Sequence, residues 1–142
     1  MKLIVKRTPG PRRTEMPEFV KLIDVYEGEL PDKQEGIWNA VGNRDFQRSF
    51  QVVTVNPVEW FNKPTPTGQT PKEIYEDYAE PWQRKLVKQY RKSVDVLNAT
   101  RYVVVEQTSE NTDVIDGWHR MVAFALEGRT AARAIDLCLP QE

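Results

Sequence analysis

A stretch near the end of the chain constrains the fold more than any other. Asp113 to Ile115 reads as a strand, Gly117 breaks it, and a helix-compatible segment starts near Trp118 and runs through Met121 to Leu126, where Gly128 is placed to end it. The alternating residues Ile135, Leu137 and Leu139 then predict a final strand. Strands joined through a helix need a sheet on which that helix can pack. We therefore predict an α/β (α+β) fold, a mixed sheet flanked by helices.

The preceding part of the chain is predicted to supply the remaining elements. We expect a helix over 17–27, a strand over 50–55 that ends at an Asn-Pro turn, a helix that starts at Pro71, a second helix from about Pro81 to Leu97, a strand over 101–106 and a polar turn over 108–111. Thr70 and Glu73 have the spacing of a capping box, which fixes the start of the helix at Pro71. Residues 28–48 lose any clear period, so an irregular connection is predicted there.

Length, charge and hydropathy limit the class of protein. A chain of 142 residues fits one domain, residues 1–142, in which we expect 1–49 to be an N-terminal extension without an assigned role. A net charge of −1 argues against a surface built throughout to coat nucleic acid. No stretch reaches the roughly 18 apolar residues of a membrane span, and charges follow too soon after Met1 for a secretory signal. With a single cysteine, Cys138, the chain is predicted to be cytoplasmic.

The predicted helix from Pro81 to Leu97 has two contrasting faces. Its apolar face is expected to dock on the core and holds Trp82, Leu86, Val87, Tyr90, Val94 and Leu97. The opposite side, here called the basic face, holds Arg84, Lys85, Lys88, Arg91 and Lys92. Such a face is typical of a solvated helix, and it is also what a nucleic-acid backbone would contact.

The residues Asp116-Gly117-Trp118-His119-Arg120, here called the 116–120 turn, form the strongest candidate site. Unpaired amides and the dipole at a helix N-terminus favour an anion, above all a phosphate. Gly117 allows close approach of the backbone, Arg120 offers a two-pronged donor, and His119 can donate a hydrogen bond or a proton. Trp118 is placed to lie near a base or sugar. Asp116 has three open roles: to hold His119 or Arg120, to cap the helix, or to help hold Mg²⁺.

The segment from Val114 to Ala123, followed by Leu126-Glu127-Gly128 and a strand, resembles the core of the ParB/sulfiredoxin superfamily. The resemblance covers roughly 101–139, and 50–60 more loosely. It implies that the turn binds phosphates of ATP, CTP or ADP, through Gly117, Trp118, His119 and Arg120. Members of that superfamily include sulfinic-acid reductases, free-amino-acid kinases, nucleotide-gated partition proteins and reported nucleases.

Departures from the superfamily pattern narrow this range. Sulfiredoxins carry a cysteine immediately before His-Arg, whereas this chain has Trp118, so we do not expect a sulfiredoxin. Partition proteins continue into a helix-turn-helix and a dimerisation domain, so a complete partition protein is not expected either. The Asp-Gly-X-His-Arg pattern itself is most similar to the turn of free-serine kinases.

Three functions remain open on the sequence. The first is an enzyme for Mg-assisted phosphoryl transfer or phosphate-ester hydrolysis on a nucleotide or nucleic acid, with Asp116 beside the metal and Asp116 and His119 as catalytic residues. The second is a non-catalytic regulatory module of a phage or mobile element that binds a nucleotide or DNA. The third is a structural interaction protein, in which the turn serves packing and holds no phosphate.

Overall fold

The computed structural model describes residues 18–25 and 48–138, and a five-stranded sheet forms its frame. Along the sheet the strands are β1 (Glu18–Lys21), β2 (Ser49–Val55), β5 (Ala132–Asp136), β3 (Val103–Gln107) and β4 (Thr112–Asp116). The pair β3 and β5 is parallel and the other neighbouring pairs are antiparallel. The predicted mixed sheet in an α+β domain is therefore confirmed.

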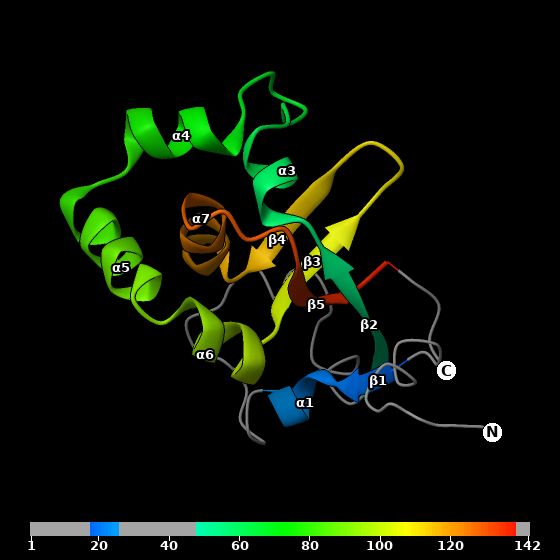
Figure 1. Cartoon of the computed structure of the whole chain (residues 1–142). Coiled ribbons are helices and arrows are strands. Elements are labelled where there is room, and N and C mark those ends of the chain that lie inside the picture. Colours follow the sequence, from blue (N-terminus) through cyan, green and yellow to red (C-terminus); the bar gives the residue numbers. More distant parts are fainter. Residues whose placement is uncertain (1–17, 26–47, 139–142) are drawn as a thin grey trace.

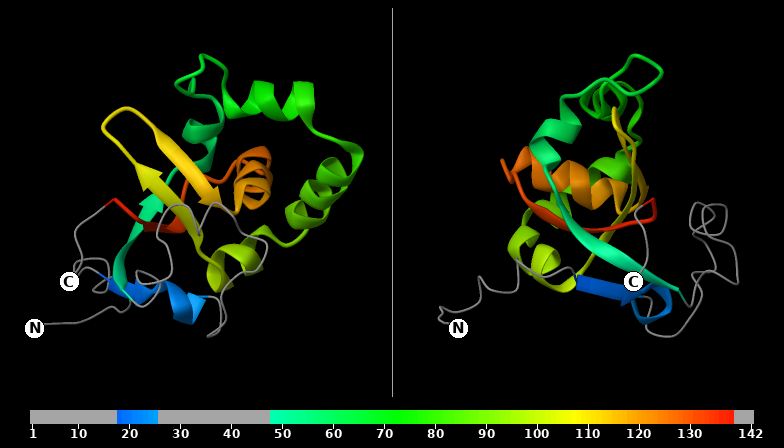
Figure 2. Two further views of the ribbon diagram at one scale, coloured as in Figure 1. Left: turned by 180° about the vertical axis from the view of Figure 1, so that it is seen from behind. Right: turned by 90° about the vertical axis from the view of Figure 1, so that its right-hand side faces the viewer.

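Most of the helices pack around a single central helix. The helices are α1 (Leu22–Val25), α3 (Pro57–Phe61), α4 (Pro71–Tyr78), α5 (Pro81–Arg91), α6 (Val94–Thr100) and α7 (Trp118–Leu126). Figure 1 and the reverse view in Figure 2 show α3 to α6 as an arc around α7, and each of them contacts α7. The helix predicted after Gly117 is thus the central helix of the fold.

The core has two parts, one on each face of the sheet. Residues Met121 to Ala125 of α7 are all buried against the face that carries Val103 and Val105. Val104, between them, points to the opposite face and packs with Leu22 of α1 in a smaller cluster. Because side chains alternate along a strand, the run of valines in β3 supplies both parts of the core.

Two predicted helix ends are confirmed. At the start of α4, the Thr70 hydroxyl accepts the Glu73 amide at 3.0 Å and the Glu73 carboxylate accepts the Thr70 amide at 2.9 Å, which completes the capping box. After α7, Gly128 has a φ of +73° and the Arg129 amide donates to the Phe124 carbonyl at 2.9 Å. A glycine in this left-handed conformation is the usual way to end a helix.

The predicted helix over 17–27 is only partly confirmed in the residues that the structure describes, because its first half is a strand. Residues Glu18–Lys21 form β1, which pairs with β2, and only Leu22–Val25 form a single helical turn. The sheet edge offers Phe19 and Val20 a strand partner, and that tertiary pairing outweighs their helical spacing. Part of the predicted extension therefore belongs to the sheet. The rest of that predicted helix and the irregular connection over 28–47 lie outside the described residues.

The predicted helix from Pro81 to Leu97 is two helices. The first, α5, ends at Arg91, and α6 begins at Val94 after Ser93, whose φ of −134° is not helical. The break lets Val87 and Val94 both reach the core, at 1% and 6% exposure. Trp82 was expected to dock there as well, but it is 58% exposed.

Two smaller predictions need adjustment. The Asn-Pro turn after β2 is the start of α3, with Asn56 as the N-cap whose side chain accepts the Glu59 amide at 3.0 Å. The final strand ends at Asp136, and Leu139 lies outside the described residues. In the described ranges, no helix is long and apolar enough to cross a membrane.

Candidate functional site

A pocket of about 390 Å³ opens at the start of α7 and is here called the α7 pocket. All five residues of the 116–120 turn line it, together with Leu86, Tyr90, Leu97 and Arg101. The turn lies between the end of β4 and the first turn of α7, and the other four residues come from α5, α6 and the residue after α6. The structure therefore brings all the predicted site residues to one cavity.

Gly117 gives the turn its shape. Its φ of +96° lies in the left-handed region, which favours glycine, and it is the N-cap of α7. As a glycine, the N-cap residue has no side chain that could accept from the amides of the first turn of α7. With the helix dipole, these donors favour an anion at this end of the pocket.

Arg120 is held in place by the protein itself. Its Nη1 donates to the Tyr102 carbonyl at 3.1 Å, and its Nη2 lies 3.8 Å from Oδ2 of Asp116. Its side chain is 14% exposed. A guanidinium carries five N–H donors, so these contacts leave donors for a ligand while fixing the orientation of the group. Arg120 therefore both bonds to Tyr102, just before β3, and lines the pocket.

Asp116 ends β4, and the N-cap position of α7 is occupied by the next residue, Gly117. The Asp116 side chain is 16% exposed and faces the guanidinium of Arg120. The two opposite charges lie four residues apart at the floor of the pocket, so the arrangement matches the role of holding Arg120.

His119 is half-buried between aromatic rings. Its ring lies 5.7 Å from that of Trp82 and 5.4 Å from that of Trp118, and its Nε2 is 3.1 Å from Nε2 of Gln83. Burial lowers its pKa below the ordinary 6.5, because desolvation disfavours the imidazolium. The ring is therefore neutral at pH 7. Since the Gln83 amide nitrogen can only donate, the neutral ring accepts at Nε2 and carries its proton on Nδ1.

Trp118 connects the pocket to the core. Its ring meets Trp60 of α3 edge-on, with centroids 6.1 Å apart, and lies 6.3 Å from Tyr75 of α4. Trp118 is half-buried and also lines the pocket, so only part of it is available to a ligand. These ring contacts connect the start of α7 to α3 and α4.

Sequence reasoning missed four lining residues. Leu86, Tyr90 and Leu97 were expected to dock on the core. Tyr90 and Leu97 do pack against it, and all three are half-buried and also form the apolar wall of the pocket. Arg101 was placed in a strand, whereas it follows α6, is exposed, and has no side-chain partner in the described part of the chain. No local pattern links Arg101 to the 116–120 turn, because the break between α5 and α6 brings it there.

A metal site built by the protein alone is not present in the described ranges, where no three His, Cys, Asp or Glu side chains gather. Among the described residues that line the pocket, Asp116 is the one with a carboxylate. Mg²⁺ takes phosphate oxygens and water among its ligands and needs only one or two carboxylates. The residues present therefore fit Mg²⁺ only as an ion that arrives with phosphates.

No family model, no curated protein and no solved structure matches this chain. The resemblance to the ParB/sulfiredoxin superfamily stays a prediction.

Proposed function

We propose that the α7 pocket binds the phosphate of a nucleotide. The observation that carries this proposal is the convergence of three donor sets on one cavity: the first amides of α7, Arg120 and Arg101. Amides at a helix N-terminus favour an anion, and guanidinium groups bind phosphate oxygens in pairs. Arg101 is the more available of the two cations, because Arg120 is already bonded to Tyr102.

The rest of the pocket suits the uncharged part of a nucleotide. Leu86, Leu97 and the Tyr90 ring form a wall that can contact a base or sugar, and the volume of about 390 Å³ lies in the range of small-molecule sites. Asp116 can accept a hydrogen bond from a hydroxyl or share Mg²⁺ with the phosphates. The resemblance to ParB/sulfiredoxin proteins supports the same ligand class.

Chemistry at this site would be phosphoryl transfer or phosphate-ester hydrolysis. Mg²⁺ bound to the phosphates would supply charge neutralisation there. Neutral His119 can accept a proton at Nε2 once Gln83 moves aside, and Arg120 would hold the phosphate in a fixed orientation. These roles make His119 the base candidate and Asp116 the metal-associated candidate.

A non-catalytic module that binds a nucleotide or DNA is the second candidate. The observation in its favour is that the polar groups of the turn already have partners: Arg120 contacts Tyr102 and Asp116, and His119 contacts Gln83. Groups held in this way can bind a ligand without a reaction. The two candidates differ in turnover: the enzyme converts its bound nucleotide, and the binding module does not.

One experiment separates these functions. The protein is mixed with each of the four NTPs and with ADP, with and without Mg²⁺, while its Tm and released phosphate are followed. A ligand at about 100 times its Kd stabilises the folded state by about 2.7 kcal/mol, which is easily seen as a rise in Tm. A rise in Tm with phosphate release indicates the enzyme, and a rise alone indicates the binding module. Unchanged Tm with all five nucleotides would contradict the proposal.

A further inference from the structure

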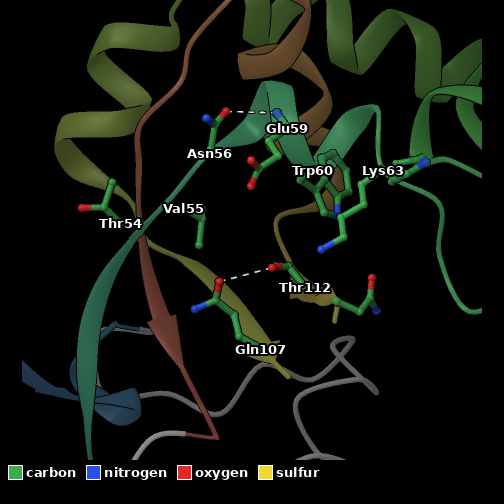
Figure 3. A pocket seen from close by; sticks show the side chains of 10 residues that line it. Thr54, Val55, Asn56, Glu59, Trp60, Lys63, Gln107 and Thr112 are labelled. Carbon is green, nitrogen blue, oxygen red and sulfur yellow. Dashed lines mark hydrogen bonds between the residues drawn. The ribbon is translucent and has the colours of Figure 1, made fainter. Parts of the chain in front are cut away.

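A second pocket, of about 190 Å³, lies between α3 and the hairpin of β3 and β4 and is here called the Trp60 pocket (Figure 3). It is lined by Thr54, Val55, Asn56, Glu59, Trp60, Lys63, Pro71, Gln107, Asn111 and Thr112. It shares no residue with the α7 pocket. The ligand of the Trp60 pocket is therefore independent of the ligand proposed for the α7 pocket.

The indole N–H of Trp60 is a buried donor that has no acceptor among the described residues. Trp60 is 7% exposed, and in the described structure no oxygen or nitrogen accepts from its Nε1. Figure 3 shows the indole nitrogen on the side of the ring toward Lys63 and Thr112, inside the pocket. A buried donor left unpaired is costly, and a tryptophan N–H normally finds a partner. The geometry therefore points to an acceptor supplied by a ligand.

Two opposite charges enter the same pocket without pairing. Glu59 and Lys63 are four residues apart, a spacing at which such side chains commonly pair on a helix. However, α3 ends at Phe61, so Lys63 has left the helix, and neither side chain forms an ion pair in the described ranges. Figure 3 shows both directed into the cavity. The pocket thus holds an anion and a cation apart.

The floor of the pocket is polar and fixed. The Thr112 hydroxyl donates to Oε1 of Gln107 at 3.2 Å, and Nε2 of Gln107 donates to Oδ2 of Asp136 at 3.1 Å. Asp136 is 1% exposed and also accepts the Cys138 amide at 2.9 Å. This chain of hydrogen bonds keeps Gln107 from turning up to satisfy Trp60 or Lys63. The pocket is therefore held open by its own floor.

We propose that the Trp60 pocket binds a small zwitterion. The cationic group of the ligand contacts the Glu59 carboxylate, and its anionic group accepts from Nε1 of Trp60 and from the Lys63 ammonium. A volume of about 190 Å³ is below the roughly 300–1,000 Å³ of sites for drug-sized ligands, which favours a small ligand. A simple anion would meet Glu59 and a simple cation would meet Lys63, so either charge alone is disfavoured.

The indole N–H of Trp60 provides a direct test by NMR. The chain has four tryptophans, so its indole region holds few signals, and Trp60→Phe assigns the one of interest. Glycine, β-alanine and γ-aminobutyrate, which separate their charges by increasing distances, are titrated to about 10 mM, with acetate and methylammonium as single-charge controls. We expect at least one zwitterion to shift this signal and to bind at least about tenfold more tightly than either control.

Charge variants of Glu59 and Lys63 provide a second test, because both side chains are exposed and their replacement should not disturb the fold. Glu59→Gln and Lys63→Gln are each expected to weaken zwitterion binding about tenfold, whereas Glu76→Gln on α4, outside both pockets, leaves it unchanged. If Trp60→Phe does not fold, the signal is assigned by elimination, from replacement of the other three tryptophans, Trp38, Trp82 and Trp118. Equal binding of acetate and the zwitterions, no shift with any compound, or unaltered binding in both charge variants would overturn the proposal.

Discussion

Arg120 folds back over Gly117 so closely that a β-carbon at position 117 would lie 2.9 Å from Nη2 of the guanidinium. The same side chain donates to the Tyr102 carbonyl and faces Asp116. The glycine therefore has two purposes in this turn. It adopts the left-handed conformation that starts α7, and it leaves the space in which the guanidinium is held.

Replacement of Gly117 by alanine is expected to cost more stability than the same change at Gly68. Both glycines have nearly equal φ, +96° and +95°, but no atom lies within 4 Å of the β-carbon position at Gly68. Gly68→Ala therefore reports the backbone strain alone, about 1–3 kcal/mol. Gly117→Ala adds the displacement of Arg120. Urea unfolding measures the difference, and equal losses would show that Arg120 moves aside without cost.

Arg101 and Arg120 are expected to behave differently when each is removed. Arg101→Gln should weaken nucleotide binding by about 1.5–3 kcal/mol, the range for a charge-assisted hydrogen bond, without changing Tm, because Arg101 has no protein partner in the described ranges. Arg120→Ala should weaken binding and also lower the free energy of unfolding by about 1 kcal/mol, since the Tyr102 bond is lost. Nucleotide titration measures the affinity of both variants, and urea unfolding measures their stability. Unchanged nucleotide affinity in both variants would exclude the phosphate site.

The sequence was sufficient to predict the parts of the fold that depend on local chemistry. Thr70 with Glu73, and Gly128 after α7, act through backbone groups a few residues away, so their roles can be read from spacing. The sequence was not sufficient where contacts between distant residues determine the local structure. Residues Glu18–Lys21 form a strand because they pair with β2, and the helix breaks at Ser93, which allows α6 to pack on the core.

The same distinction applies to the candidate site. The 116–120 turn is contiguous in the sequence, and its strand, glycine and helix identify it without a structure. Its partners come from far along the chain: Gln83 meets His119 over 36 residues, and Tyr102 meets Arg120 over 18. The Trp60 pocket gives no sequence signal, because Glu59, Lys63 and Thr112 converge only through the packing of α3 beside the hairpin.

Stability is expected to fall with acidification through His119. Burial lowers the pKa of His119 in the folded state, while the unfolded chain keeps the ordinary 6.5. Below that pH the unfolded state binds a proton that the folded state resists, so the free energy of unfolding decreases as pH falls through 6.5 toward the lower, folded-state pKa.

His119→Asn isolates this effect because it removes the only histidine of the chain. Urea unfolding at about pH 5 and pH 7 should show a smaller loss in the variant than in the parent, while the carboxylates contribute to both alike. Equal losses in the two proteins would mean that His119 titrates with an unchanged pKa on folding.

Arg84, on the basic face, is predicted to be a structural residue. Its guanidinium donates to the carbonyls of Ala79 at 3.2 Å and Glu76 at 2.8 Å, at the C-terminal end of α4, and lies over the Tyr75 ring. Arg84→Gln should lower the free energy of unfolding by about 1 kcal/mol, whereas the matched change Lys85→Gln should stay within about 0.5 kcal/mol. Thermal and urea unfolding compare the two. If Arg84→Gln is as stable as the parent, the Arg84 side chain has no structural role and belongs with the solvated residues of the basic face.

Nucleic-acid binding by the basic face is the last prediction, and we expect none at about 150 mM salt. Arg84 holds α4, and Arg91 forms a 2.6 Å ion pair with Glu127, which leaves Lys85, Lys88 and Lys92 for phosphates. With a net charge of −1, the chain supplies little long-range attraction.

The test uses the triple replacement of these lysines by glutamine, with fluorescence anisotropy of labelled DNA and RNA over a range of salt. The replaced side chains make no bond to the protein in the described ranges, so the triple variant should keep its fold and its affinity for free nucleotides. Micromolar binding by the parent at about 150 mM salt, lost in the triple variant with a salt slope reduced by about one per contact, would contradict the prediction. That result would make a nucleic acid the preferred partner, since three lysines of the basic face would then bind its backbone.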